Sequence, residues 1–280
     1  MKKIASILLL VITSLSCTNQ DTNSSIDPSK LALVRFYPDT PYEKQWFFYH
    51  NGLLKDIKNV EGAILQHFTY DANGNLLSNS IYSDGAPTIT HTFTYDNNGH
   101  VTSVNGIPVS YDSAENAYIK NIISGSENYT YTYSLNAERL LIRQGYHGVN
   151  EDGTEQGEWY ISDFLNGNLK WYYDGIAGAG DYQYDTKINP FKTALLPIVR
   201  TIFITNSYAA TANWSIGEYS SDHNVQSNGY DSEGPEDSVY EYEYNANNLP
   251  VKCVGNSYYL GNLEGSAIQT LYYYQGDIIP

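Results

Sequence analysis

The chain has 280 residues and a formal net charge of −16, and 28 of its side chains are tyrosine. An acidic surface argues against nucleic acid as a partner, because phosphate groups bind to cationic faces. Short runs of Tyr, Thr, Ile and Val between Gly and Asn favour strands and turns. No segment shows a 3.6-residue apolar period over more than two turns, so the sequence predicts an all-β protein.

Residues 1–16 have the organisation of a signal peptide. Lys2 and Lys3 form a basic start, and a short apolar run follows over residues 4–12. A helix of that length is too short to cross about 30 Å of hydrocarbon, which favours a signal peptide over a membrane-spanning anchor.

The residues Ser14-Leu15-Ser16-Cys17 resemble a bacterial lipobox. The resemblance implies cleavage before Cys17 and acylation of that cysteine; the alternative is an ordinary signal peptide with an incidental cysteine. Residues 17–30 are polar and predict a flexible tether. A lipid on Cys17 would make a membrane the partner and place the protein in the cell envelope. The expected location is the outer membrane, on its periplasmic or surface face.

A phrase recurs in the rest of the chain: an aromatic residue, a polar turn of three to five residues, and apolar residues. Its clearest copies start at Tyr70-Asp71 and Tyr95-Asp96. Asn-Gly and Asp-x-x-Gly tolerate the left-handed backbone that tight hairpins require. Further copies start at Tyr49, Tyr111, Tyr133, Phe164, Tyr184 and Tyr244.

Each phrase predicts one β-hairpin, which is marginally stable alone and must pair with its neighbours. We therefore expect a single domain over residues 31–280. Its fold should be a series of tandem antiparallel β-hairpin repeats that form a long twisted or curled sheet.

Tyr70, Asp71, Gly74 and Leu76 resemble the YD repeats of RHS-type proteins, whose pattern is close to Tyr-Asp-x-x-Gly-x-Leu. In that family many repeats wrap into a closed shell around a cargo. The few loose copies here imply an open or curled sheet instead. With its lipobox, the chain also resembles small uncharacterised lipoproteins of the Bacteroidota, which carry no established activity.

A second resemblance, to MORN-type repeats, covers residues 152–175. It rests on two aromatic stretches, one around Trp159-Tyr160 and one around Trp171-Tyr172. MORN repeats are also runs of aromatic hairpins, so both resemblances imply the same architecture.

Residues 189–237 interrupt the series of repeats and predict an irregular insertion. The stretch 190–197 predicts one short helical turn, which Pro197 would end. Residues 201–204 are strand-like. Residues 220–237 are polar and rich in Gly, Ser and Asp, which predicts a long exposed loop.

Asp71, Asn73 and Asn75 have the 1-3-5 spacing of a calcium-binding loop. However, Leu76 and Tyr82 stand at positions 6 and 12, where that loop needs Gly and Glu. We therefore expect a turn and no metal site, and no cofactor.

No catalytic residue is assigned. The histidines are scattered, and there is no Gly-x-Ser-x-Gly motif. Cys253 would be the one cysteine left after cleavage, and we expect a small buried strand residue there. The remaining enzymatic alternative is a hydrolase with carboxylates in residues 189–240.

The tryptophans Trp46, Trp159, Trp171 and Trp214 are candidates for stacking against a ligand. Neighbouring residues in runs such as 272–274 point to opposite faces of a strand, so some aromatic rings must face away from the core. Exposed rings can stack on sugars or form a protein interface. The alternative is that aromatic side chains form ladders across strands.

Two short stretches, Asp112-Ser113-Ala114 and Asp237-Ser238-Val239, look like the acceptor pattern of Bacteroidota O-glycosylation. Ser113 and Ser238 are therefore candidate modification sites.

These features predict a membrane-anchored, non-enzymatic protein that binds or scaffolds in the cell envelope, with a glycan or another envelope protein as its partner. One alternative is a carbohydrate-binding lipoprotein that uses exposed Trp and Tyr, and another is a hydrolase.

Overall fold

The computed structural model describes residues 26–124, 127–147, 158–173, 178–205, 219–230, 236–259 and 262–280. The lipobox with Cys17, most of the expected tether, and Trp214 lie outside these residues. Among the described residues, no helix combines the length and apolarity that a membrane crossing requires.

The described residues form eighteen strands, and each pairs antiparallel with the next along the chain. Their bounds are β1 Leu31–Phe36, β2 Lys44–Phe48, β3 Leu54–Asn59, β4 Ile64–Tyr70, β5 Leu76–Ser83, β6 Ala86–Tyr95, β7 Val101–Val104, β8 Ile107–Asp112, β9 Ala117–Ser124, β10 Glu127–Leu135, β11 Leu141–His147, β12 Glu158–Leu165, β13 Asn168–Tyr173, β14 Gly178–Ile188, β15 His223–Tyr230, β16 Glu236–Tyr244, β17 Pro250–Tyr259 and β18 Asn262–Tyr274. The all-β prediction with tandem hairpins is confirmed.

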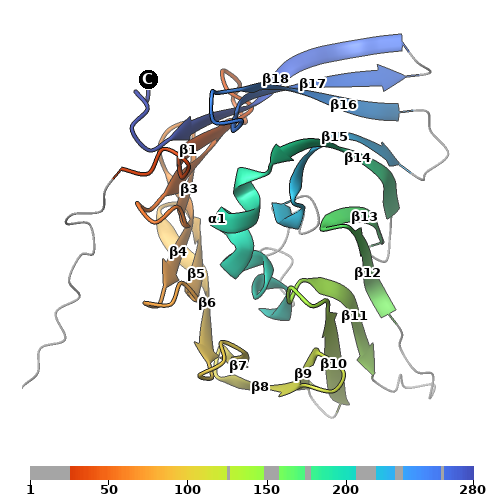
Figure 1. Cartoon of the computed structure of the whole chain (residues 1–280). Helices are drawn as coiled ribbons and strands as arrows, with labels where there is room; N and C mark the ends of the chain where they lie inside the picture. Colours follow the sequence, from red (N-terminus) through yellow and green to blue (C-terminus); the bar gives the residue numbers. More distant parts are fainter. Residues whose placement is uncertain are drawn as a thin grey trace, which may run out of the picture.

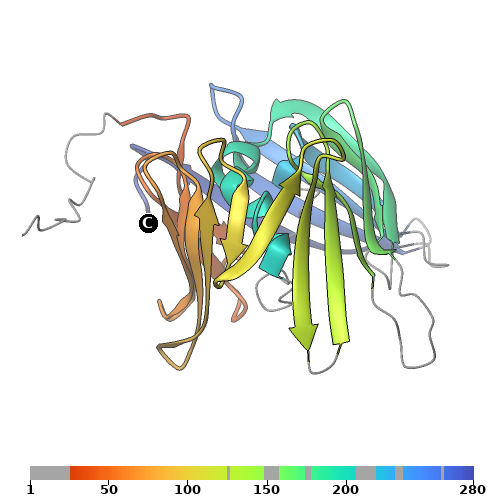
Figure 2. The same cartoon turned by 90° about the horizontal axis from the view of Figure 1, so that it is seen from below.

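The sheet curls until its first strand pairs with its last. Leu33 of β1 lies opposite Phe47 of β2 on one side and opposite Tyr273 of β18 on the other. Figure 1 looks along the resulting ring of strands, and Figure 2 shows it from the side. Of the two expected forms, open or curled, the protein adopts the curled one, and the strand pairing runs around the whole ring.

The core lies inside the ring. Alternate strand residues such as Leu54, Phe68 and Leu76 point inward and are fully buried. Outward-pointing hydroxyls pair across neighbouring strands, as between Thr69 and Ser78 at 2.7 Å. The inner faces carry most of the apolar core, with some buried polar residues such as Asn79 and Lys120 among them.

A helix fills the middle of the ring (Figure 1). This helix, α1, spans Pro190–Val199, and the Asn189 side chain caps it by accepting from the Phe191 N–H. The prediction that Pro197 ends the helix is wrong, because the helix continues to Val199 with Pro197 inside it. Its apolar face is buried against the inner faces of the strands, and that burial outweighs the lost backbone hydrogen bond.

The strand expected at residues 201–204 is also absent. Ile202–Thr205 instead forms the short 3-10 helix η1, whose first three residues are at most 2% exposed. An apolar run of four residues carries no period that distinguishes a strand from a buried helical turn. Burial inside the ring decides the conformation.

The polar stretch expected as an exposed loop contains strand β15, His223–Tyr230, paired with β14 and β16. Its polar side chains bond to neighbouring segments. Asn224, for example, donates to the Asp185 carboxylate at 3.1 Å, and the Ser221 hydroxyl accepts from the Leu169 N–H at 3.0 Å. The loop prediction is wrong for this strand, because polarity here reflects hydrogen bonding rather than exposure.

Candidate functional site

One tight turn recurs at one end of the ring. In the turn after β4, the Asp71 carboxylate accepts the N–H groups of Asn73 and Asn75 at 2.8 and 2.9 Å. Burial opposes the charge on Asp71, but the hydrogen bonds from Asn75 and Asn73 outweigh it and keep its pKa below the usual range. The same pair of bonds, to the residues two and four positions on, is made by Asp96, Asn136 and Asn245.

These bonds give the role of the Asp71 turn. Both carboxylate oxygens of Asp71 are engaged, because Asn75 Nδ2 donates to the second one at 2.9 Å. Within the described residues, no three His, Cys, Asp or Glu side chains gather in a way that could hold a metal ion. The hydrogen bonds of Asp71 show that it shapes the turn, as the turn interpretation expected.

The fourth residue of each turn adopts a left-handed backbone. Gly74 and Gly99 have φ of 83° and 75°, which glycine adopts without strain. In the turn after β10, Arg139 holds the same position with φ of 63°. A non-glycine residue there costs on the order of 1–2 kcal/mol, so the Arg139 side chain is displayed at a cost in stability.

Repeat tyrosines tie neighbouring strands together. The hydroxyls of Tyr70 and Tyr95 donate to the carbonyls of Leu54 and Leu76 at 2.8 and 2.7 Å. Each acceptor lies at the start of the strand before the tyrosine's own. Tyr184 and Tyr274 repeat this contact with the carbonyls of Leu169 and Pro250. Many tyrosines are therefore structural, a role that the sequence motif did not reveal.

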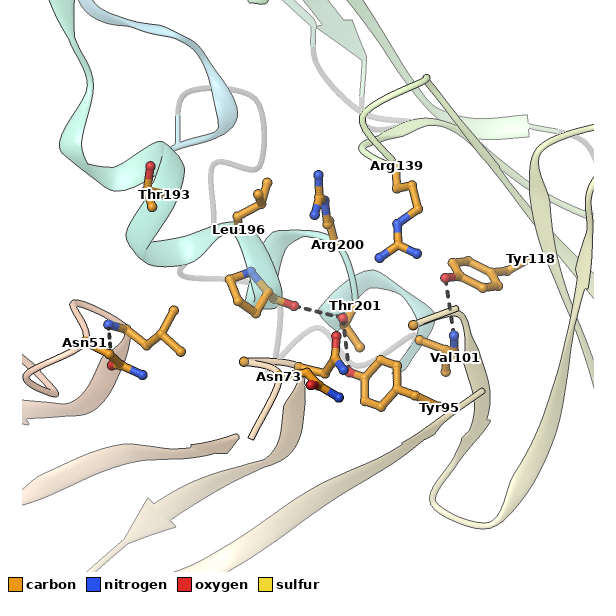
Figure 3. A pocket seen from close by; sticks show the side chains of 15 residues that line it. Asn51, Asn73, Tyr95, Val101, Tyr118, Arg139, Thr193, Leu196, Arg200 and Thr201 are labelled. Carbon is orange, nitrogen blue, oxygen red and sulfur yellow. Dashed lines mark hydrogen bonds between the residues drawn. The ribbon is translucent and has the colours of Figure 1, made fainter. Parts of the chain in front are cut away.

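A pocket of about 320 Å³ lies where these turns meet α1 (Figure 3). We call it the turn-end pocket. Its walls combine polar turn residues with an apolar side made mainly by the helix. The turns and nearby strands supply Asn51, Leu53, Asn73, Gly74, Asn75, Tyr95, Gly99, Val101, Tyr118 and Arg139, and α1 with the residues after it supplies Thr193, Leu196, Pro197, Arg200 and Thr201.

Arg139 and Arg200 are the charged residues that line the turn-end pocket. Backbone carbonyls position both: Arg200 Nε donates to the Glu138 carbonyl at 2.8 Å, and Arg139 Nη1 donates to the Asn98 carbonyl at 3.3 Å. Burial and the neighbouring charge of Arg139 lower the pKa of Arg200. The pocket is thus cationic in a protein of net charge −16.

The acidic side chain whose charge acts on Arg200, Glu138, is already paired. The Glu138 carboxylate lies 2.9 Å from Lys192 Nζ. Among the described residues, no carboxylate lies within ion-pair distance of Arg139 or Arg200. The two guanidinium groups therefore repel each other, and the Glu138 charge offsets that repulsion only in part at Arg200.

Of the predicted tryptophans, the structure describes the side chains of Trp46 on β2 and Trp171 on β13. Trp46 is 3% exposed and packs on Phe36 and Phe191, with ring centroids 4.6 and 5.8 Å away, which corrects the expectation of an exposed ring there. Trp171 is half-buried on β13. Trp159 lies in β12, but its side chain is outside the described part of the chain. All of Trp214 is outside it as well.

Aromatic side chains instead gather at a second pocket, of about 170 Å³. We call it the aromatic pocket. It lies beside the start of α1, where Asn189 and Phe191 line it, and Tyr37, which is 49% exposed, stands at its edge. Tyr219, Tyr240, Tyr242 and Tyr272 are further lining residues.

The remaining predicted residues fall at separate places. Ser113 is exposed in the turn after β8, and Ser238 is half-buried on β16. Cys253 is 3% exposed, and burial raises the pKa of its thiol to about 12. This confirms that Cys253 is a small buried strand residue.

Comparison with known proteins gives no family. No protein-family model matches the chain, and no curated protein shows significant sequence similarity. The similarities to YD and MORN repeats therefore remain resemblances.

Solved structures that show some similarity to this chain include two porin-like proteins. The one from Bacteroides uniformis has 15% identity, covers 90% of this chain and 99% of its own, and has a TM-score of 0.45. The one from Bacteroides vulgatus has 9% identity, 88% and 99% coverage, and a TM-score of 0.32. A structure described as TcdB2-TccC3-TEV has 12% identity, 84% and 13% coverage, and a TM-score of 0.25. Similarities this low carry no argument about function.

Proposed function

We propose that this chain is a non-enzymatic binding protein of the cell envelope and that a small molecule binds in its turn-end pocket. The observation that carries the proposal is the pocket itself. Turns from separate hairpins and the helix α1 converge on one cavity, although no single repeat could form it.

The build of the pocket suits a small ligand. Its volume of about 320 Å³ lies within the usual range for small-molecule sites. Leu53, Leu196 and Pro197 provide an apolar side, and the turns provide hydrogen-bonding groups. The turn hydrogen bonds fix the backbone around the cavity before any ligand arrives, which lowers the entropic cost of binding.

A screen with a blocking variant tests this proposal. Thr193 is exposed on α1 at the pocket wall, so Thr193→Trp should fill the cavity with little loss of stability. The matched control is Gln226→Trp, at an exposed position of β15 outside the pocket. A library of neutral sugars, sugar acids, sugar phosphates and amino acids would be screened by thermal shift.

We expect at least one compound to raise the melting temperature of the wild type and of Gln226→Trp but not of Thr193→Trp. A library in which every stabilising compound acts equally on all three proteins would contradict the proposal, because binding would then lie elsewhere.

The anchoring part of the proposal rests on the lipobox-like sequence and has its own test. We propose that Cys17 carries the lipid that holds the protein to a membrane. In a bacterial host fed a labelled fatty acid, the wild type should take up label and Cys17→Ser should not. Equal labelling of the two proteins would count against the anchor.

Carbohydrate binding is the second candidate function. The aromatic pocket supports it better than the predicted tryptophans do. The exposed ring of Tyr37 lies beside further tyrosines, an arrangement that can stack on a sugar face. A glycan array should give hits that Tyr37→Ala loses and that Tyr42→Ala, at a residue 79% exposed, retains. An array without hits would remove this candidate.

The hydrolase alternative has less support. In the described part of residues 189–240, the Asp222 carboxylate is bonded to Lys192. O-glycosylation of Ser113 and Ser238 stays a proposal, and the intact mass of protein from a native-like host tests it.

A further inference from the structure

We propose that the turn-end pocket selects a ligand that carries an oxyanion, either a carboxylate or a phosphate group, and holds it between Arg139 and Arg200. The inference rests on the proposed binding function and adds the chemical class of the ligand.

The first argument is the position of Arg139. Its turn has the same Asx hydrogen bonds as the turns at Asp71 and Asp96, and those turns place glycine at the left-handed position. An arginine there carries backbone strain that glycine avoids. The strain coincides with a side chain that lines the pocket, as Figure 3 shows, and that donates to the Asn98 carbonyl in the turn at Asp96.

The second argument is the unbalanced charge. Arg139 and Arg200 face one cavity, and the Glu138 charge offsets the repulsion at Arg200 only in part, since the pKa of Arg200 stays lowered. Asp71 and Asp96 accept hydrogen bonds within their own turns, and Glu138 pairs with Lys192. Two like charges held together in a partly buried site are stabilised when an anion lies between them.

The third argument is the supply of donors. The bond from Arg200 Nε to the Glu138 carbonyl uses one donor of the guanidinium and leaves its two terminal nitrogens. The Tyr118 hydroxyl accepts from the Val101 N–H at 3.3 Å, so its own proton can go to a ligand oxygen. Guanidinium groups bind carboxylates and phosphates through two parallel hydrogen bonds.

Beside these donors, Leu196 and Pro197 add an apolar part to the lining. A ligand that fits has an anionic end and a less polar body. The cavity volume of about 320 Å³ suits a small molecule such as an acidic monosaccharide or a sugar phosphate rather than a polymer.

The test measures binding by calorimetry at low chloride concentration, with glucuronate, glucose 6-phosphate and glucose as probes. We expect one or both anionic probes to bind at least about tenfold more tightly than glucose. A preference for glucuronate would assign the carboxylate, and one for glucose 6-phosphate the phosphate. Binding should weaken as salt is added.

Three variants separate the ion contacts from the fold. Arg139→Gly introduces the glycine that the turns at Asp71 and Asp96 have, and Arg200→Gln keeps a polar side chain. Each variant should weaken anion binding at least about tenfold. The matched control is Asn248→Gly, at the same left-handed position of the turn at Asn245. It should bind the anion as the wild type does.

Two results would overturn the inference. One is a glucose affinity equal to that of both anions, or no binding of either anion at about 10 mM. The other is unchanged anion binding in both arginine variants. Neutral compounds that stabilise the wild type but not Thr193→Trp would still support the pocket, so the two proposals fail separately.

Discussion

The repeat turns and the plug inside the ring show two ways in which this sequence specifies structure. Each turn depends on a few adjacent residues: an Asp or Asn side chain caps the backbone, and the fourth residue accepts a positive φ. The plug, formed by α1 and η1, depends on the ring around it. Ile198 and Ile204 are fully buried by strands that are distant in sequence.

This difference shows where a local sequence pattern is sufficient to determine the structure. A turn is stabilised by contacts within five residues, so the same residues give the same turn wherever they occur. The helix contains Pro197, which local propensity disfavours, and persists because its apolar face is buried. Substitutions can test whether the two regions differ in this way.

The largest effect is expected in the plug. Leu195 of α1 is fully buried, and Leu195→Ala should lower the free energy of unfolding by about 2–5 kcal/mol because it opens a cavity. Thr193→Ala, at an exposed position of the same helix, should change it by less than about 0.5 kcal/mol. Urea denaturation measures both. Equal effects would show that α1 is not held by burial.

The next effect lies at the contact between ring and plug. Lys120 of β9 is 2% exposed, donates to the Ile204 carbonyl and lies 5.7 Å from the Tyr131 ring centroid. Burial lowers the pKa of Lys120 to about 8 from 10.5, so keeping it charged at pH 7 costs about 3 kcal/mol.

The sign of the pH dependence follows. Between about pH 8 and 10.5 the unfolded chain holds a proton on Lys120 that the folded protein has lost. The Lys120 contribution to stability therefore rises with pH over this window. Lys120→Met should remove that rise and stabilise the protein at pH 7, whereas Lys170→Met, at an exposed lysine, should retain it. Denaturation at several pH values measures the difference, and parallel curves for wild type and Lys120→Met would contradict it.

A smaller effect is expected where neighbouring repeats are tied together. Tyr70→Phe removes the hydroxyl that donates to the Leu54 carbonyl at 2.8 Å. Because that leaves a buried carbonyl without a partner, we expect a loss of about 1–2 kcal/mol. Tyr42→Phe, at an exposed tyrosine, should change stability by less than about 0.5 kcal/mol. Equal losses would mean that the hydroxyl bond is not what joins the repeats.

The same division explains what could be predicted from the sequence. The all-β class, the hairpins and the turn role of Asp71 rest on local chemistry, and the structure confirms them. Helix α1 beyond Pro197, the 3-10 helix at residues 202–205 and strand β15 depend on burial and partners that no local pattern contains.

The turn-end pocket was missed for a similar reason. Its two arginines lie 61 positions apart in the sequence and meet only because the ring brings a turn to the end of α1. One signal becomes visible once the turn is counted from Asn136, the residue that makes the hydrogen bonds of Asp71, rather than from Tyr133. Arg139 then occupies the position that is Gly74 in the turn at Asp71 and Gly99 in the turn at Asp96.

The smallest expected effect concerns Arg139 and is a gain in stability rather than a loss. Arg139→Gly should raise the free energy of unfolding by about 0.5–1 kcal/mol, because glycine relieves the left-handed strain but gives the unfolded chain more freedom. Asn248→Gly should change it by only a few tenths of a kcal/mol, since asparagine tolerates this conformation better.

Thermal and urea unfolding of the two variants measure this difference. If Arg139→Gly gains stability and loses anion binding, the arginine serves ligand binding at a cost in the stability of its turn. If Arg139→Gly were instead less stable than the wild type, Arg139 would be supporting the fold. Its place at the pocket would then need no ligand to account for it.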